Sequence, residues 1–303
     1  MAISIERLIN NPAAIKVAAF IALTTPPRLG YSIAKSAAWW ISSRRNSELG
    51  RAVRSNQWVA TGEKSSSQLL DQAVQTVFQN SARSIYDLYH YFNDAGEVGQ
   101  MYSIEPSFQT VYSRPEFERC GLVVAGLHMV GFDLGLQWLC RNQFKPLVLT
   151  IPNPQGGRRM EFETRQRSGM RMVPGSFTGL RRAIRHLQLG GVVVTGIDRP
   201  VPESEPRPCF FGRPAALPIH HIYLALKAHV PIVVAATRLE ENGKYHIYAS
   251  PSIEMDSYPN RADERLMNAE KVLAVAEEFI RPAPQQWLIF QPVWPEIIND
   301  IPG

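Results

Sequence analysis

The sequence predicts an α/β protein, with a central, mostly parallel sheet flanked by helices and an N-terminal helical segment ahead of it. Two observations lead to this fold class. From residue 121 onward, short runs rich in Val, Ile and Leu alternate with segments of helical period, which is typical of parallel strands joined by crossover helices. Residues 1–95 show helical patterns instead, so they are expected to precede the sheet.

The chain begins with two apolar segments, 13–23 and 29–42, separated by Thr24-Thr25-Pro26-Pro27. The first is too short to predict a membrane span. The second contains two tryptophans and ends at Arg44 and Arg45. Apolar and aromatic helices with flanking basic residues are typical of a bilayer interface. The alternative is an N-terminal helical hairpin packed on the protein core.

Two further helices are expected before the sheet, over residues 48–59 and 69–92. Ser66 or Ser67 is the predicted N-cap of the second, and Thr61-Gly62-Glu63-Lys64 is the turn between the two. We therefore divide the chain into an apolar, membrane-associated segment over 1–45 and a single α/β domain over 46–303.

Strands and helices alternate in the second half of the chain. The predicted strands are 121–126, 144–151, 192–197, 232–237 and 245–249, and the predicted helices are 132–141, 179–189, 219–228 and 262–280. The last helix carries an apolar stripe that is most simply core. An irregular loop with four prolines, 200–208, follows the third strand.

His128 and Asp133 are the first candidate catalytic residues. Five residues apart on a regular helix, they would lie roughly 140° apart. The pair makes better sense if His128 lies in the turn after a strand and Asp133 in the first turn of the next helix, where a carboxylate is favoured and can reach the imidazole. A histidine held by a carboxylate at the end of a strand can act as a general base toward a hydroxyl. The alternative is a core histidine and a chance spacing.

Asp198 and Arg199 form a second candidate cluster, because they follow the strand 192–197 and should emerge at the same sheet edge as His128. Arg167 and Arg171, with Arg165, lie in a basic stretch between these strands. The guanidinium group matches the geometry of phosphate oxygens, so Arg167, Arg171 and Arg199 are candidates for phosphate contacts. Arg171 or backbone N–H groups near Gly131 could stabilise an oxyanion.

Composition limits the partners. The 303 residues are 45% hydrophobic and 19% charged with a net charge of +5, which favours an anionic partner such as a phospholipid surface. The charge is dispersed and no nucleic-acid-reading motif is visible, so no nucleic acid is expected.

The three cysteines form no zinc pattern, and the adjacent His220 and His221 would point about 100° apart on a helix. We expect no metal, no cofactor and, because no signal peptide is evident, a cytoplasmic location for most of the chain.

Several segments resemble one family in their order along the chain. They are Arg51-Ala-Val-Arg-Ser-Asn56, His128-x4-Asp133, the Arg167 region, the strand leading to Asp198, Phe210-Phe211-Gly212-Arg213-Pro214-Ala215, and Pro284-Gln285-Gln286-Trp287. Together they resemble the lipid A biosynthesis (lauroyl/myristoyl) acyltransferases and the related phosphatidylinositol mannoside acyltransferases of the lysophospholipid acyltransferase superfamily. Two features depart from that pattern: Gln285 replaces a usual Glu, and no basic tail follows Trp287.

The resemblance implies a glycerolphosphate acyltransferase-like fold and an O-acyltransferase activity. A fatty acyl chain would move from an acyl thioester, on acyl carrier protein or coenzyme A, to a hydroxyl of a glycolipid or phospholipid-type acceptor. His128 would be the base and Asp133 its partner, with Asp198 and Arg199 in the second block of the site. The resemblance places the protein at the cytoplasmic face of a bacterial inner membrane.

Two other functions fit the same residues. A lipid hydrolase would use His128 and Asp133 to activate water, although no G-x-S-x-G nucleophile elbow is present. A non-catalytic lipid-binding or scaffold protein would tolerate the loss of His128.

Overall fold

The computed structural model describes residues 12–115, 118–151 and 157–302. At its centre is a seven-stranded sheet in the order β1-β9-β8-β2-β5-β3-β4. The strands of this sheet are β1 (Tyr102–Ile104), β2 (Leu122–Gly126), β3 (Leu147–Thr150), β4 (Arg171–Pro174), β5 (Val192–Gly196), β8 (Ile232–Leu239) and β9 (Tyr245–Ala249). Strands β8, β2, β5, β3 and β4 are parallel, whereas β9 and β1 run in the opposite direction. The predicted α/β fold with a mostly parallel sheet is confirmed.

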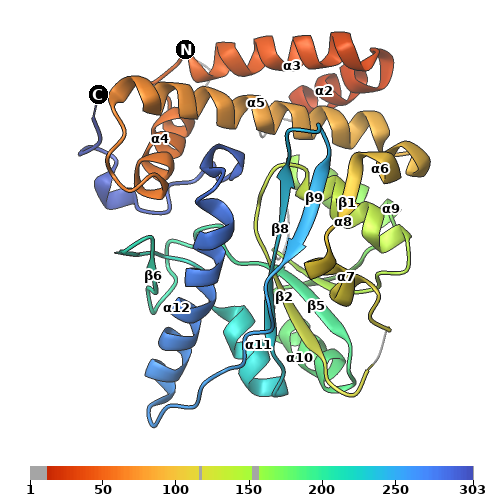
Figure 1. The fold of residues 1–303 in the computed structure, drawn as a ribbon, viewed down its shortest axis with the longest axis vertical. Coiled ribbons are helices and arrows are strands. Elements are labelled where there is room, and N and C mark those ends of the chain that lie inside the picture. The colour runs from red at the N-terminus through yellow and green to blue at the C-terminus, as the bar shows by residue number, and fades with distance from the viewer. Residues whose placement is uncertain (1–11, 116–117, 152–156, 303) are drawn as a thin grey trace.

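Helices cover both faces of this sheet and one of its edges (Figure 1). They are α2 (Pro12–Thr24), α3 (Pro27–Ser42), α4 (Glu48–Ala60), α5 (Ser67–Tyr91), α6 (Ala95–Met101), α7 (Pro106–Tyr112), α8 (Phe132–Arg141), α9 (Gly157–Arg167), α10 (Phe177–Gln188), α11 (His220–Ala228) and α12 (Arg261–Ile280). A short hairpin of β6 (Cys209–Phe210) and β7 (Arg213–Pro214) packs beside α12. The long helix α5 crosses one end of the sheet, and α2 and α3 lie beyond it (Figure 1).

The two faces of the sheet form separate cores, because successive side chains of a strand point to opposite faces. Val123 and Val193 belong to the larger core, which is shared with α10, α11 and α12. Val124 and Val194 belong to the second core, which lies under α7 and α8. All four are 7% exposed or less, so the β2 and β5 strands are buried on both sides, as expected of central parallel strands.

The N-terminal helices α2 and α3 form a hairpin that packs on α5. The Tyr86 ring on α5 lies against Gly30, where a Cβ atom would be 2.0 Å from Tyr86 Cε2. The Tyr86 hydroxyl donates a hydrogen bond of 2.8 Å to the carbonyl oxygen of Thr25, between the two helices. The hairpin is thus docked on the protein. In the part of the chain that the structure describes, every helix is too short or too polar to cross a bilayer.

Candidate active site

His128 lies just beyond the carboxyl end of β2, as the sequence predicted. The neighbouring Gly126 is in register with Gly196 at the end of β5, so the two strands end side by side. Gly196 makes room for the imidazole, since a Cβ atom at this position would be 2.7 Å from Cε1 of His128. The sheet therefore holds the ring at its edge, where 16% of the side chain remains exposed.

The carboxylate that binds His128 is Asp198. Its Oδ1 lies 2.6 Å from Nδ1 of His128, and its Oδ2 accepts hydrogen bonds of 2.8 Å from the His128 backbone N–H and of 2.8 Å from Nε1–H of Trp287. Burial alone would raise the pKa of this fully buried carboxyl, but the charge and hydrogen bonds of His128 and the bond from Trp287 together lower it below its usual value. An ionised Asp198 accepts a hydrogen bond from Nδ1–H of His128, which leaves Nε2 of the same ring as the basic nitrogen.

The expected pairing of His128 with Asp133 is corrected by this geometry. Asp133 does lie in the first turn of α8, but its carboxylate faces α9. There it accepts two hydrogen bonds of 2.9 Å each from Nε and Nη2 of Arg165, and one of 3.2 Å from Gln137. A guanidinium that donates two hydrogen bonds to one carboxylate is a strong, charge-assisted partner. Burial alone would raise the pKa of Asp133, but Arg165, Gln137 and the nearby His128 lower it.

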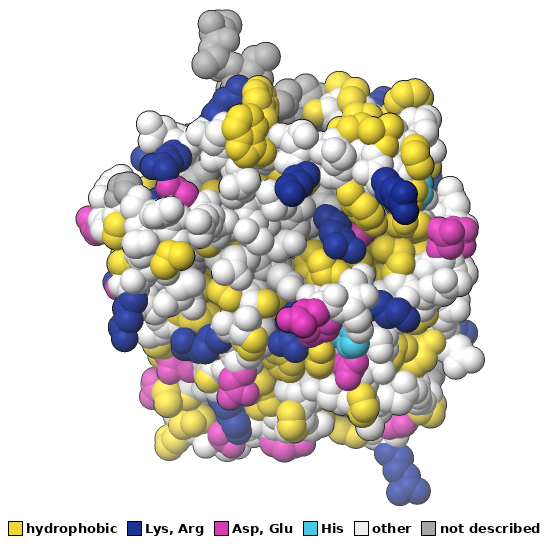
Figure 2. Space-filling view, turned by 45° about the horizontal axis from the view of Figure 1, so that its top comes forward, with side chains coloured by type: hydrophobic (Ala, Val, Ile, Leu, Met, Phe, Trp, Pro, Cys, Tyr) yellow, Lys and Arg dark blue, Asp and Glu magenta, His cyan; other side chains and the backbone are white. Residues whose placement is uncertain are grey.

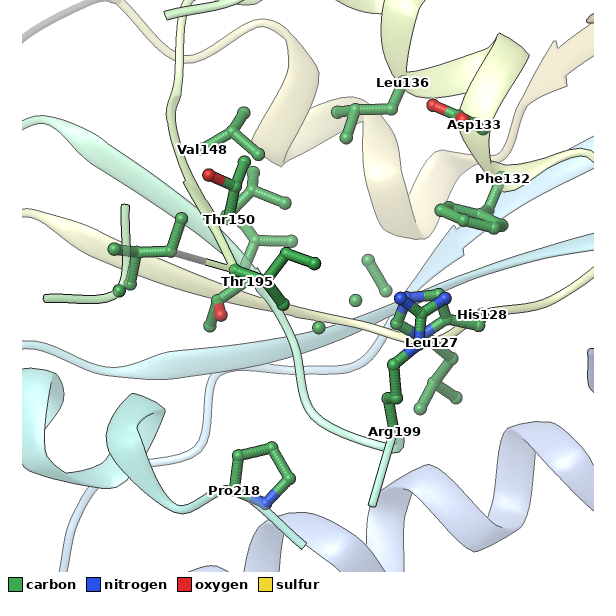
Figure 3. Close-up of a pocket in the computed structure, with 18 of the residues that line it drawn as sticks. Leu127, His128, Phe132, Asp133, Leu136, Val148, Thr150, Thr195, Arg199 and Pro218 are labelled. Atoms are coloured by element: carbon green, nitrogen blue, oxygen red, sulfur yellow. The ribbon is translucent and has the colours of Figure 1, made fainter. Parts of the chain in front are cut away.

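Of the three candidate phosphate-binding arginines, only Arg199 lines the cavity beside His128. Figure 3 shows it rising from the segment after β5 toward the imidazole. Arg167 is exposed in the last turn of α9. Arg171 begins β4 and donates to the carbonyl oxygen of Lys145. Because β4 is parallel to β2, its first residue lies at the sheet edge opposite His128, so Arg171 lies away from the base. Arg165, which was not singled out, does line the cavity.

His128 stands at the mouth of a cavity of about 720 Å³. One part of this cavity, the apolar lobe, lies between α8 and the sheet face beneath it (Figure 3). It is lined by Phe108, Val124, Leu136, Leu139, Phe144, Val148 and Ile247. Helix α8 starts at the sheet edge that carries His128, and Phe144 follows its last turn, so the lobe runs the roughly 15 Å length of the helix. Phe108 and Phe144 line its far end, with ring centroids 6.0 Å apart.

Two polar side chains line the opposite part of the cavity. Thr195 of β5 and His220 of α11 meet there, with 2.5 Å between Oγ1 and Nε2. Burial lowers the pKa of His220 to about 4, so the ring is neutral at physiological pH. Within the described ranges, no three His, Cys, Asp or Glu side chains gather in a way that could hold a metal ion.

Comparisons with known proteins identify the family. Residues 13–296 match the model of the family described as "Bacterial lipid A biosynthesis acyltransferase". The chain belongs to this family. A search of curated proteins found no match. Among solved structures, a distant similarity is found to the 1-acyl-sn-glycerophosphate (LPA) acyltransferase PlsC from Thermotoga maritima, with 13% identity and a TM-score of 0.35 over 67% of this chain and 86% of that chain.

Family membership confirms the resemblance predicted from the sequence, and it makes the protein an acyltransferase that acts on a lipid acceptor with an acyl thioester as the general class of donor. Two of the segments that carried the resemblance are in contact, the one that ends at Asn56 and the one that contains Trp287. Asn56 on α4 donates to the carbonyl oxygens of Ile289, at 3.1 Å, and Gln291, at 2.9 Å, and accepts from the N–H of Val293 at 3.0 Å. It thereby fixes the chain that follows Trp287.

The C-terminal segment of the acyltransferase also pairs directly with the backbone around His128. The N–H of Leu288 donates to the His128 carbonyl oxygen at 2.8 Å, and the N–H of Val130 donates to the Gln286 carbonyl oxygen at 2.9 Å. Trp287 lies between them and reaches Asp198. The role of Trp287 was missed from the sequence, although its place in the C-terminal signature was a signal for it.

Proposed function

We propose that the protein transfers a fatty acyl chain from acyl carrier protein or coenzyme A to a hydroxyl of a glycolipid or phospholipid-type acceptor, with His128 as general base. The observation that carries this proposal is the His128–Asp198 pair at the mouth of a deep, largely apolar cavity. A base is placed where a polar reaction can occur, and an apolar chain can extend away from it.

In the proposed reaction, Nε2 of His128 takes the proton of the acceptor hydroxyl as that oxygen attacks the thioester carbonyl carbon. The tetrahedral intermediate collapses to the ester, and the departing thiolate takes the proton back from the imidazolium. Asp198 holds the ring by Nδ1 and stabilises the imidazolium while it exists. The reaction requires no cofactor, because the thioester is already activated, and it forms no acyl-enzyme.

The negative charge on the intermediate's oxygen requires a donor. The N–H of Gly131 already donates to Oγ of Ser84, at 3.1 Å, and the N–H of Val130 to Gln286. We therefore assign Arg199, which lines the cavity beside His128, to the oxyanion or to a phosphate of the acceptor headgroup or the donor's phosphopantetheine arm. Asp133 stays in the proposed site as the residue that orients Arg165 at the cavity wall.

The apolar lobe beneath α8 supports an acyl chain as the group transferred. Burying each methylene of a hydrocarbon chain contributes about 0.8 kcal/mol, so a lobe lined by aliphatic and aromatic side chains favours a long chain. The Phe108–Phe144 pair at its far end sets a limit to the chain length. The lobe opens at the edge of the sheet that holds His128, which places the carbonyl end of a buried chain near the base.

The proposed location is the cytoplasmic face of the bacterial inner membrane, and the α2–α3 hairpin supports it. Its outer side exposes Phe20, Leu23, Trp39 and Trp40, each 46% exposed or more. Basic side chains lie among them, namely Lys16, Arg28, Lys35, Arg44 and Arg45, all exposed. Figure 2 shows hydrophobic side chains and Lys and Arg together on the end of the molecule that comes forward there. Such a surface suits the interface of a bilayer with anionic lipids.

The proposal is tested by mass spectrometry of lipids from cells with and without the gene. A lipid heavier by one acyl group, present with the wild-type gene and absent with His128→Ala, is the expected result and identifies the acceptor. If the lipids of the cells are identical with and without the gene, acyl transfer to a lipid of that cell is refuted.

A further inference from the structure

Helix α5 carries a buried carboxylate that takes no part in the proposed chemistry. Asp87 is 1% exposed, and it is bound by groups from two other elements. The hydroxyl of Tyr31 on α3 donates to its Oδ1 at 2.7 Å, and the hydroxyl of Tyr245 at the start of β9 donates to its Oδ2. Arg83, one turn earlier on α5, lies 3.6 Å from Oδ2. These four residues form what we call the Asp87 cluster.

The Asp87 cluster reaches the turn between His128 and Asp133 through two aromatic rings. Tyr245 stacks on Tyr102, the first residue of β1, with ring centroids 5.1 Å apart. The hydroxyl of Tyr102 donates to the carbonyl oxygen of Gly131 at 2.6 Å. Both tyrosines are at this edge because β1 and β9 run against the other strands, so their first residues lie beside the carboxyl end of β2.

Gly131 is held on every side by this arrangement. Its carbonyl oxygen is bound by Tyr102, and its N–H donates to Ser84 on α5. Its φ of +76° lies in the left-handed region, and a Cβ atom there would be 2.6 Å from Cδ1 of Tyr245. Because Gly131 caps α8 and follows the His128 turn, its position decides how His128 and α8 face each other.

Burying a carboxylate costs free energy unless hydrogen bonds and a nearby positive charge compensate for the lost water. Burial raises the pKa of Asp87, while the hydrogen bonds from Tyr245 and Tyr31 and the charge of Arg83 lower it in part. The Arg83 guanidinium lies over both rings, 5.3 Å from the Tyr31 centroid and 5.7 Å from that of Tyr245. The Asp87 carboxylate thus fixes Tyr31 and Tyr245, which come from distant parts of the chain.

We propose that Asp87, together with Tyr31, is a positioning residue for the reaction: it fixes Tyr245, and through Tyr102 the Gly131 turn, and so ties the orientation of His128 to the seating of α3. This inference rests on the proposed function, because it assigns the cluster to the same base. A displacement of about 1 Å at reacting groups is enough to reduce a rate a hundredfold. A network that holds the turn is therefore expected to act on kcat.

The test compares Asp87→Asn and Tyr31→Phe with Tyr86→Phe in the full-length protein. Tyr86→Phe is the control because it removes a hydrogen bond between α5 and the same hairpin without touching Asp87. We expect kcat of Asp87→Asn to fall about tenfold, with KM nearly unchanged, and Tyr31→Phe to show a smaller loss of the same kind. Tyr86→Phe should keep the wild-type kcat even where it lowers the thermal stability as much as the two cluster variants do.

A second readout does not depend on turnover. The 15N resonances of the His128 imidazole, assigned with His128→Ala, should shift in Asp87→Asn and Tyr31→Phe and stay in place in Tyr86→Phe. Unchanged resonances and kcat in both cluster variants would overturn the proposal, as would an equal effect of Tyr86→Phe. If the wild-type protein transfers no acyl group, the proposed function fails, whereas the resonances still decide whether the cluster positions His128.

Discussion

Two carboxylates lie near His128, and the structure gives them different partners. Asp198 binds the imidazole and Asp133 binds Arg165. We expect Asp198→Asn to reduce kcat by about 1,000-fold or more, because an amide favours the wrong imidazole tautomer and leaves the imidazolium without a counter-charge. Asp133→Asn should reduce kcat only about tenfold, chiefly because its ion pair with Arg165 is lost.

Steady-state kinetics of the two variants, with His128→Ala as the inactive reference, decide between the carboxylates. A greater loss of kcat in Asp133→Asn than in Asp198→Asn would mean that the pairing in the working enzyme is the one expected from the sequence spacing. Circular dichroism of both variants separates these effects from loss of the fold.

The sequence predicts His128 as the base and Asp133 as its partner, whereas in the structure the carboxylate that binds His128 is Asp198. Asp133 was chosen because it is near in sequence, whereas Asp198 is 70 residues away. Their contact depends on β2 and β5 being neighbours in the sheet, which no local pattern reports. Arg171 was misplaced for a related reason. Strand β4 is short, begins with an arginine and lies at the edge of the sheet, so it lacks the apolar run that marks a central strand.

Helix α8 and the strands beneath it are predicted to set the length of the acyl chain that the cavity accepts. Leu136 lines the apolar lobe near its middle (Figure 3). Leu136→Phe should fill part of the lobe and lower kcat/KM for the longest accepted chain about tenfold or more relative to shorter chains. Leu180→Phe is the matched control, because Leu180 lines the cavity from α10, on the opposite face of the sheet. Competition assays with thioesters of different lengths measure both.

The opposite outcome is equally informative. If Leu180→Phe changes the chain-length preference and Leu136→Phe does not, the acyl chain occupies the other side of the cavity. That result would mean that the apolar lobe beneath α8 does not bind the acyl chain.

The α2–α3 hairpin is predicted to bind lipid surfaces through its tryptophans. The double variant Trp39→Ala and Trp40→Ala should bind anionic vesicles about tenfold more weakly in a sedimentation assay, because two interfacial aromatic side chains are lost. Phe177→Ala is the control, since Phe177 is 74% exposed but lies on α10, far from the hairpin in Figure 1. Equal binding of the double variant and the wild type would exclude these tryptophans from the membrane contact.

The elements themselves were largely predictable. Helix α8 and strand β9 have the predicted limits, and Ser66 is the N-cap of α5, accepting from the Leu69 N–H at 3.3 Å. The sequence analysis did not predict β1, β4, β6, β7, α6, α7 and α9. Helices α6 and α7 have seven residues each, too few for a helical period to stand out. The sequence of α9 indicates only a basic stretch, because its described side chains carry little apolar patterning.

The buried histidines of α11, His220 and His221, should make the stability of the whole protein depend on pH. Burial lowers the pKa of His220 to about 4 and that of His221 to about 3. Below about pH 6.5 the unfolded chain binds a proton at each imidazole and the folded chain does not, so acid favours unfolding. The free energy of unfolding should fall from pH 6.5 toward pH 4 by up to about 1.4 kcal/mol per pH unit for each histidine.

Urea denaturation at pH 7, 6 and 5 measures this dependence. His221→Leu should make it shallower, whereas Ile222→Val, at a buried position next to it, should lower stability by about 1 kcal/mol at every pH. A His221→Leu protein with the wild-type dependence on pH would show that His221 titrates normally.

The association of the sheet edge, the C-terminal segment and α5 around His128 is a property of the whole fold. Trp287 binds Asp198 directly, whereas Asn56 and Asp87 act from a distance, through the C-terminal segment and through Tyr245. The resemblance of the separate segments to one family could be read from the sequence, but the contacts of Asp198 and Trp287 with the His128 turn required the three-dimensional structure.

The central claim is that this site transfers an acyl group to a lipid hydroxyl by general-base catalysis at His128. It is tested most directly by measuring, with purified protein and an acyl thioester, the free thiol released, the acylated lipid and the free fatty acid, with and without acceptor lipid. We expect thiol and acylated lipid to appear in equal amounts only when acceptor is present, and His128→Ala to form neither. Free fatty acid released at the same rate without acceptor would make the protein a hydrolase and contradict the claim.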